Sequence, residues 1–127
     1  MPINSKQKGK RVELKVVHWL HDLGFTLARR GQQYAGGAGS PDVVLPEIPT
    51  LALEVKGRPS EPSKVQILAW LDQAEKEAGP GRQAALVLVV DGRSPRLIWL
   101  DDKLGMLAAM TDDAAKKVLR HWQLMFN

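Results

Sequence analysis

The feature of the sequence that most constrains the fold is a pair of short apolar runs on either side of a proline-bounded stretch. The runs cover residues 42–45 and 51–56, and Pro46-Glu47-Ile48-Pro49-Thr50 stands between them. Each run has the length of a β-strand, and the two prolines mark the connection as a turn. The segment is therefore predicted to form a β-hairpin.

The register of this hairpin determines which side chains share a face. If the turn is symmetric about Ile48, residues whose numbers sum to 96 lie opposite each other, so Asp42 faces Glu54. Directly opposed residues project from the same side of a sheet with Cβ atoms about 5 Å apart. Lys56 follows Glu54 by two positions and therefore points to that same side. One face of the hairpin is thus expected to present Asp42, Glu54 and Lys56 together.

Two opposed carboxylates repel each other unless positive charge lies between them. A hard divalent cation such as Mg²⁺ supplies that charge, because it binds carboxylate and carbonyl oxygens and keeps water ligands. In phosphodiester hydrolysis such an ion polarises the phosphate and lowers the pKa of the attacking water. Lys56 would orient that water or neutralise charge on the phosphate. Asp42, Glu54 and Lys56 therefore indicate a hydrolytic site.

Periodicity elsewhere predicts an α/β protein with a mixed sheet. Ser5 is expected to cap a first helix that Gly24 ends, and Thr111 is expected to cap the last one. The expected order is helix, three strands, helix, two strands, helix, which gives about five strands flanked by helices. The remaining predicted segments are a strand over 25–30, a glycine-rich loop over 32–40, a helix over 63–78 and strands over 84–90 and 96–100.

Charge is distributed unevenly along the 127 residues. Residues 1–40 carry seven Lys and Arg against two Asp and Glu, a net charge of +5, whereas the rest carries 11 against 12, a net charge of −1. A basic segment of this kind suits a polyanion such as nucleic acid, although it also fits a solubilising tail. The chain has the length of one domain, no cysteine, and no apolar run that approaches a membrane span, so we expect a cytoplasmic protein.

At this point two stretches of sequence resemble a known family. Ser40-Pro41-Asp42, eleven further residues and then Glu54-Val55-Lys56 resemble the signature of PD-(D/E)XK nucleases. The opening Lys8-Gly9-Lys10-Arg11-Val12-Glu13, followed by Gly24-Phe25 and Ala28-Arg29-Arg30, resembles that of archaeal-type and phage Holliday junction resolvases. The resemblance covers about residues 6–90. It implies a single restriction-endonuclease-like domain over residues 1–127.

The resemblance also implies roles for individual residues. Asp42 and Glu54 would be metal ligands together with the backbone carbonyl of Val55, and Glu13 would be an additional carboxylate of the metal site. Lys56 would be the catalytic lysine. The metal would be Mg²⁺, with Mn²⁺ able to substitute, and no small-molecule cofactor is expected. The implied activity is that of a metal-dependent, structure-selective DNA endonuclease that cuts four-way junctions as a homodimer.

Seven residues are expected to contact DNA, because they are basic or lie near the signature. They are Lys8, Lys10, Arg11, Arg29, Arg30, Ser40 and Arg58. A glutamine on the helix after the hairpin, Gln66 or Gln73, could join the site, and the sequence does not decide between them. Residues 95–127 resemble no known family, and they are expected to form a strand and a helix that serve in packing or in a dimer interface.

Three alternatives remain open at this stage. Within the same chemistry, the substrate could be a flap or a linear duplex instead of a junction. In a second reading, the chain is a non-catalytic DNA-binding module on a nuclease-like fold. In a third, it is a structural interaction domain. His18 and His21 have the spacing of metal ligands on a helix, but without a third ligand of matching type we read them as solvated.

Overall fold

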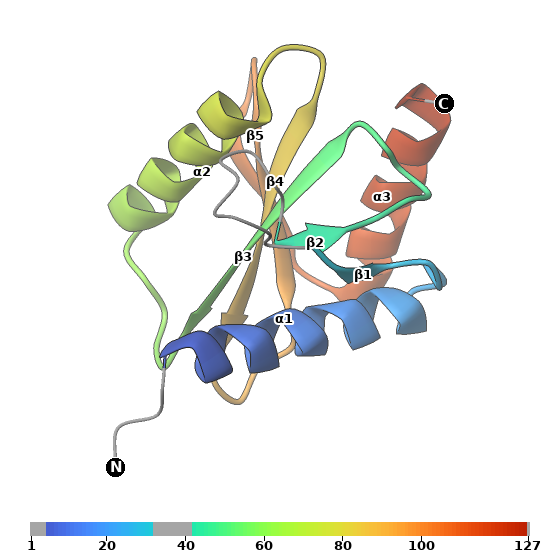
Figure 1. The fold of residues 1–127 in the computed structure, drawn as a ribbon. Coiled ribbons are helices and arrows are strands. Elements are labelled where there is room, and N and C mark those ends of the chain that lie inside the picture. Colours follow the sequence, from blue (N-terminus) through green and yellow to red (C-terminus); the bar gives the residue numbers. More distant parts are fainter. Residues whose placement is uncertain (1–4, 32–41, 127) are drawn as a thin grey trace.

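The computed structural model describes residues 5–31 and 42–126, with side chains from Gly9 to Gly31 and from Asp42 to Met125. Within these residues the chain forms three helices and one six-stranded sheet (Figure 1). The helices are α1 (Ser5–Asp22), α2 (Lys64–Ala78) and α3 (Asp112–Phe126). The strands are β1 (Arg29–Arg30), β2 (Val43–Val44), β3 (Leu51–Arg58), β4 (Gln83–Val90), β5 (Arg96–Asp101) and β6 (Gly105–Ala109).

The sheet is mixed, and its strands lie side by side in sequence order. Strands β3 and β4 are parallel because α2 connects them as a crossover, and every other neighbouring pair is antiparallel. The prediction of an α/β fold with a mixed sheet is therefore confirmed. The described part of the sheet has six strands instead of about five, because β6 was not predicted. Its sequence Gly-Met-Leu-Ala-Ala is short and contains residues that are weak strand formers.

The predicted hairpin is present in the predicted register. Val43 lies opposite Leu53, two positions whose numbers sum to 96. Strand β2 is shorter than expected, with two residues, whereas β3 extends to Arg58. As a result, β3 continues well past the end of its partner on that side.

The strand predicted over residues 25–30 is wrong for most of its length. Only Arg29 and Arg30 form a strand, and residues 26–27 lie in a turn. Phe25 instead belongs to the hydrophobic core, and its N–H donates to the carbonyl of Leu20 in the turn that ends α1. Gly24 makes this turn with φ of +104°, a conformation that glycine adopts without strain. Phe25 is therefore buried as part of the turn that ends α1 and not as part of a strand.

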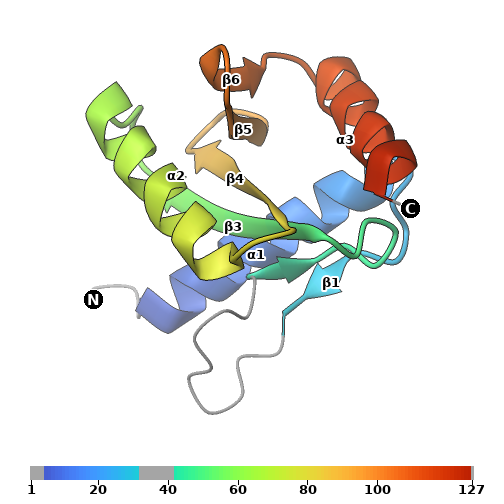
Figure 2. The same ribbon diagram turned by 90° about the horizontal axis from the view of Figure 1, so that it is seen from above.

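The helices cover the two faces of the sheet unequally, as Figure 2 shows. Helices α1 and α3 pack on one face, where the larger core includes Leu20, Leu53 and Leu119, each fully buried. Helix α2 packs on the other face through Ile67 and Leu71 against β4 and β5. Strand β4 is buried on both faces, as its continuous apolar sequence predicts.

The chain after β4 is part of this architecture. Strands β5 and β6 extend the sheet, and α3 joins the larger core through Trp122, whose ring meets Trp99 edge to face at 5.4 Å between centroids. The predicted cap of α3 is confirmed, because Thr111 Oγ1 accepts a hydrogen bond of 3.0 Å from the N–H of Ala114. No helix in the described ranges is both long enough and apolar enough to cross a membrane.

Candidate active site at the edge of β3

The candidate site lies where β2 ends, beside the part of β3 that has no partner on that side among the described strands. Asp42, the residue before β2, accepts a hydrogen bond of 2.9 Å at Oδ2 from the backbone N–H of Val55. The N–H and C=O of one strand residue point toward the same neighbour, so the carbonyl of Val55 faces this edge as well. The backbone of Val55 and the carboxylate of Asp42 are therefore held together at this edge of β3.

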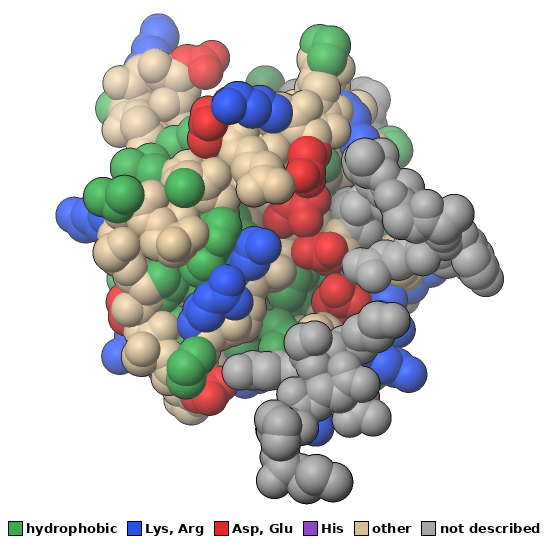
Figure 3. Space-filling view, turned by 60° about the vertical axis from the view of Figure 1, so that its left-hand side comes forward, with side chains coloured by type: hydrophobic (Ala, Val, Ile, Leu, Met, Phe, Trp, Pro, Cys, Tyr) green, Lys and Arg blue, Asp and Glu red, His purple; other side chains and the backbone are tan. Residues whose placement is uncertain are grey.

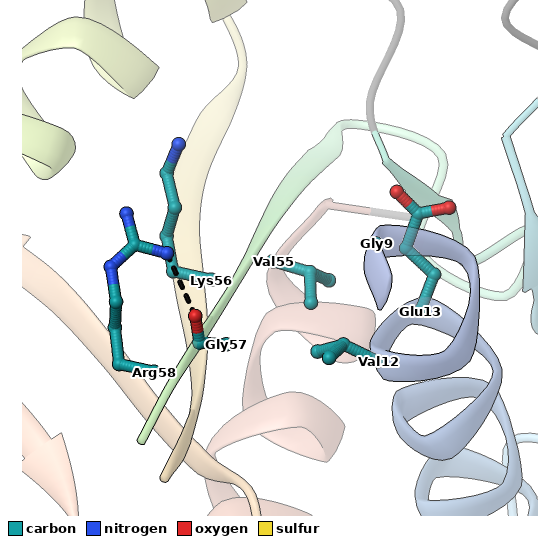
Figure 4. A pocket seen from close by; sticks show the side chains of 7 residues that line it. All are labelled: Gly9, Val12, Glu13, Val55, Lys56, Gly57 and Arg58. Carbon is teal, nitrogen blue, oxygen red and sulfur yellow. Dashed lines mark hydrogen bonds between the residues drawn. The ribbon is translucent and has the colours of Figure 1, made fainter. Parts of the chain in front are cut away.

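Side chains of β3 alternate between the two faces at this edge. Lys56 and Arg58 project toward α2, whereas Val55 projects toward α1 (Figure 4). Glu54 lies two positions from Lys56 and lines a small hollow with it beneath α2. Asp42 stands opposite Glu54 by extension of the observed register. The structure thus brings Asp42, Glu54 and Lys56 to one face.

Glu13 reaches the same edge from α1, on the other side of the sheet. It lines an open groove of about 320 Å³ with Gly9, Val12 and residues 55–58. Gly57 permits this approach, because a Cβ at that position would lie 2.7 Å from Cγ2 of Val12. A contact that short is not tolerated without movement of α1. The absence of a side chain at Gly57 therefore lets Val12 of α1 pack closely against β3.

Four carboxyl groups, which we call the acidic row, follow one another across this region: Glu13, Asp42, Glu54 and Glu77. The pKa of Glu54 is raised from 4.5 to about 8, and burial is the largest cause. The neighbouring Asp42 and Glu77 contribute to this rise, whereas Lys56 opposes it. Burial likewise raises the pKa of Glu13, with Arg30 opposing and Asp42 adding to the effect. Figure 3 shows acidic side chains in a row on this face, with basic side chains beside them. Ionisation of Glu13 and Glu54 is thus disfavoured where the two sides of the sheet edge meet.

Arg30 was expected to contact DNA, but in the structure it binds Glu13. Its Nε donates to Oε1 of Glu13 at 3.0 Å, and the side chain of Glu13 is only 12% exposed. A half-buried carboxylate with a guanidinium partner is stabilised in its charged form. Arg30 therefore neutralises one end of the acidic row.

The chemistry of the residues fits a hard divalent cation at the centre of the acidic row. The carboxyl groups of Asp42 and Glu54 share a hydrogen bond when Glu54 is protonated, and a cation would replace that proton. The carbonyl of Val55 would add a third oxygen from the same edge. Within residues 5–31 and 42–126, no three His, Cys, Asp or Glu side chains are arranged to hold a metal ion. Glu13 is directed at Arg30, so two carboxylates and one carbonyl are the donors that the geometry offers.

Helix α2 brings Trp70 and Glu77 to the site, two residues that were not predicted from the sequence. Trp70 and Gln73 line the hollow beside Glu54 and Lys56, and Gln73 Nε2 donates to Oε1 of Glu77 at 3.0 Å. Of the two glutamines left open by the sequence, Gln73 lines this hollow and Gln66 does not. Gln66 is exposed, and its backbone N–H is bound by the Ser63 cap at the start of α2. Trp70, Gln73 and Glu77 have i, i+3, i+7 spacing, a signal that could have grouped them on one helical face.

The other residues expected to contact DNA are spread more widely. Arg58 lies beside Lys56 at the site, and Lys10 is exposed on α1. Arg11 lines a separate hollow on the outer face of α1, away from Glu13, and Arg29 is exposed on β1. Ser40 and the side chain of Lys8 lie outside the described residues, as does the glycine-rich loop.

Comparison with protein-family models, with curated proteins and with solved structures finds no match for this chain. The assignment of a function therefore depends on the residues and geometry of the site.

Proposed function

We propose that this protein is a metal-dependent DNA endonuclease of the PD-(D/E)XK type that hydrolyses phosphodiester bonds. The observation that carries the proposal is the meeting of Asp42 and Glu54 at the edge of β3, with Lys56 on the same face. Two carboxyl groups in contact at neutral pH must either share a proton, at a cost in folding free energy, or bind a cation between them. A function that uses a bound cation gives a reason for placing these two carboxyl groups in contact.

In the proposed reaction each residue has a distinct role. Asp42, Glu54 and the carbonyl of Val55 would hold Mg²⁺ or Mn²⁺, which supplies Lewis-acid activation of the phosphate and of water. Asp42 is positioned for this by its hydrogen bond to the N–H of Val55. Lys56 would orient the attacking water or stabilise negative charge on the phosphate, because its ammonium group lies on the same face as Glu54.

DNA is the favoured substrate because the described residues form a groove at the site and basic residues flank it. A groove at a sheet edge admits a polymer backbone, and Lys56 and Arg58 stand at its rim. The excess positive charge of residues 1–40 adds a sequence-independent attraction for phosphates. We propose a four-way junction as the preferred DNA, cut by a homodimer, on the strength of the resemblance of residues 6–90 to junction resolvases.

A second candidate function is DNA binding without cleavage. The ion pair between Glu13 and Arg30 favours it, since this pair removes one of the carboxylates that the resemblance assigns to the metal. In that case Asp42 would serve mainly to bind the backbone of Val55 at the end of the hairpin. Binding of DNA with no cutting in either Mg²⁺ or Mn²⁺ would favour this candidate.

The test is cleavage of labelled DNA by the purified protein in Mg²⁺, in Mn²⁺ and in EDTA. Four-way junction, flap and linear duplex are compared, together with the variant Lys56→Ala and the control Lys76→Ala, whose Nζ pairs with Asp72 on the exposed side of α2. We expect paired nicks in the junction that require metal, disappear in Lys56→Ala and persist in Lys76→Ala. Equal cutting of all three DNAs would remove the junction preference, and no metal-dependent cutting of any DNA would refute the nuclease.

A further inference from the structure

We infer that Trp70 is a positioning residue that holds Lys56 and Arg58 at the rim of the candidate active site. The indole ring of Trp70 lies beneath two cations at once. Arg58 Cζ is 4.7 Å from the ring centroid and Lys56 Nζ is 5.7 Å from it, both within the range of a cation–π interaction. Trp70 reaches them from the middle of α2, where it also packs on the smaller core of the sheet.

The arrangement needs an explanation because the two cations repel each other. Lys56 and Arg58 are two residues apart on β3 and project to the same side (Figure 4). Without a partner, such long side chains sample many rotamers in solvent, and like charges favour conformations that separate them. The negative face of an aromatic ring attracts both groups, and tryptophan provides the strongest such face among the side chains. One ring therefore accounts for the placement of both side chains.

One hydrogen bond and one electrostatic attraction act on these side chains beside the acidic row. Arg58 Nη1 donates to the carbonyl of Gly57 at 2.7 Å, which brings the guanidinium back to the edge of β3. Lys56 is attracted to the carboxyl group of Glu54, which lies in the same hollow. The ring of Trp70 offers the ammonium group of Lys56 a second partner, with Nζ 5.7 Å from the ring centroid. Loss of the ring would let Lys56 collapse onto Glu54, away from an incoming phosphate.

The consequence for catalysis rests on the proposed function, whereas the positioning itself does not. If Lys56 acts on the phosphate or its water, removal of the ring should lower kcat more than it raises KM. We expect Trp70→Leu to lose about tenfold in kcat and Trp70→Phe, which keeps an aromatic face, to stay within about threefold of the parental protein. Leu68→Ala is the control, because Leu68 is an exposed apolar residue of the same helix that is 42% exposed.

The positioning is measured without DNA by nuclear magnetic resonance of the side-chain methylene protons. Methylene groups held over an indole ring resonate upfield of those in other lysines and arginines. We expect upfield shifts for Lys56 and Arg58 that disappear in Trp70→Leu and persist, reduced, in Trp70→Phe and unchanged in Leu68→Ala. Absence of the upfield shifts in the parental protein would overturn the inference, whether or not the protein cuts DNA.

The two measurements separate the inference from the proposed function. If the parental protein cuts no DNA, the proposed function fails, and the proton shifts alone decide whether Trp70 positions the two cations. If the protein cuts DNA and Trp70→Leu loses the shifts with kcat unchanged, the positioning role in catalysis is refuted.

Discussion

Replacement of Glu54 by glutamine should stabilise the protein at high pH. Glutamine has nearly the same shape as glutamate, and its amide can donate to Asp42 as the protonated carboxyl group of Glu54 does. The substitution therefore removes one negative charge from the acidic row and keeps the contact. Its effect isolates the free energy that the folded protein loses by ionising Glu54 next to Asp42.

The magnitude follows from the raised pKa. A shift from 4.5 to about 8 sets a ceiling of about 5 kcal/mol at about 1.4 kcal/mol for each pH unit. The carboxyl group is only partly buried, and solvent screens its interactions, so we expect about 2 kcal/mol.

The sign of the pH dependence is fixed by the direction of the shift. The folded protein binds this proton more tightly than the unfolded chain does, so the contribution of Glu54 to stability is complete below pH 4.5. It is lost as the pH rises toward about 8. The parental protein and Glu54→Gln should therefore have similar stability at pH 4.5, and the variant should be more stable by about 2 kcal/mol at pH 9.

The assay is urea unfolding followed by tryptophan fluorescence at pH 4.5, 7 and 9, in buffer that contains EDTA. The control is Glu75→Gln, an exposed residue of α2, for which we expect a change below about 0.5 kcal/mol at every pH. The contributions of the other titrating groups to the free energy of unfolding cancel in the difference between the parental protein and the variant. A difference that stays constant from pH 4.5 to pH 9 would refute the raised pKa of Glu54, which burial and the neighbouring Asp42 cause.

Three further predictions concern packing at Gly57, the charge of Glu13 and the cap of α3. Gly57→Ala should destabilise the protein by about 1–3 kcal/mol in urea unfolding, because its Cβ would meet α1, whereas Gly9→Ala has open space and should be neutral or stabilising. Arg30→Met should raise the pKa of Glu13 further, since the guanidinium lowers it, and carboxyl ¹³C titration measures this. Thr111→Ala should lower the free energy of unfolding by about 1 kcal/mol through loss of the α3 cap, and an unchanged midpoint would refute the cap.

The pairing of Asp42 with Glu54 could be predicted because it depends on local geometry alone. Side chains alternate along a strand with a period of two, and a short turn fixes which residues oppose each other. The observed partners Val43 and Leu53 obey the same sum of residue numbers that the symmetric turn requires. Lys56 then follows from Glu54 with no further information.

The contacts that depend on packing between distant elements could not be predicted. Arg30 and Glu13 lie 17 residues apart, and their ion pair requires that β1 pack beside α1. The helical face of Trp70 could be recognised from spacing, but its position over Lys56 follows only once α2 crosses from β3 to β4. The role of Gly57 likewise appears only when α1 lies against β3.

The measurement that tests the central claim most directly is single-turnover cleavage of DNA by the parental protein and by Asp42→Asn. Asp72→Asn, on the exposed side of α2, is the matched control. A mixture of four-way junction, flap, duplex and supercoiled plasmid makes the result independent of substrate preference. We predict cleavage that requires Mg²⁺ or Mn²⁺, that Asp42→Asn abolishes while DNA binding survives, and that Asp72→Asn retains. Cleavage by Asp42→Asn at the parental rate, or no metal-dependent cleavage of any DNA, would contradict the account.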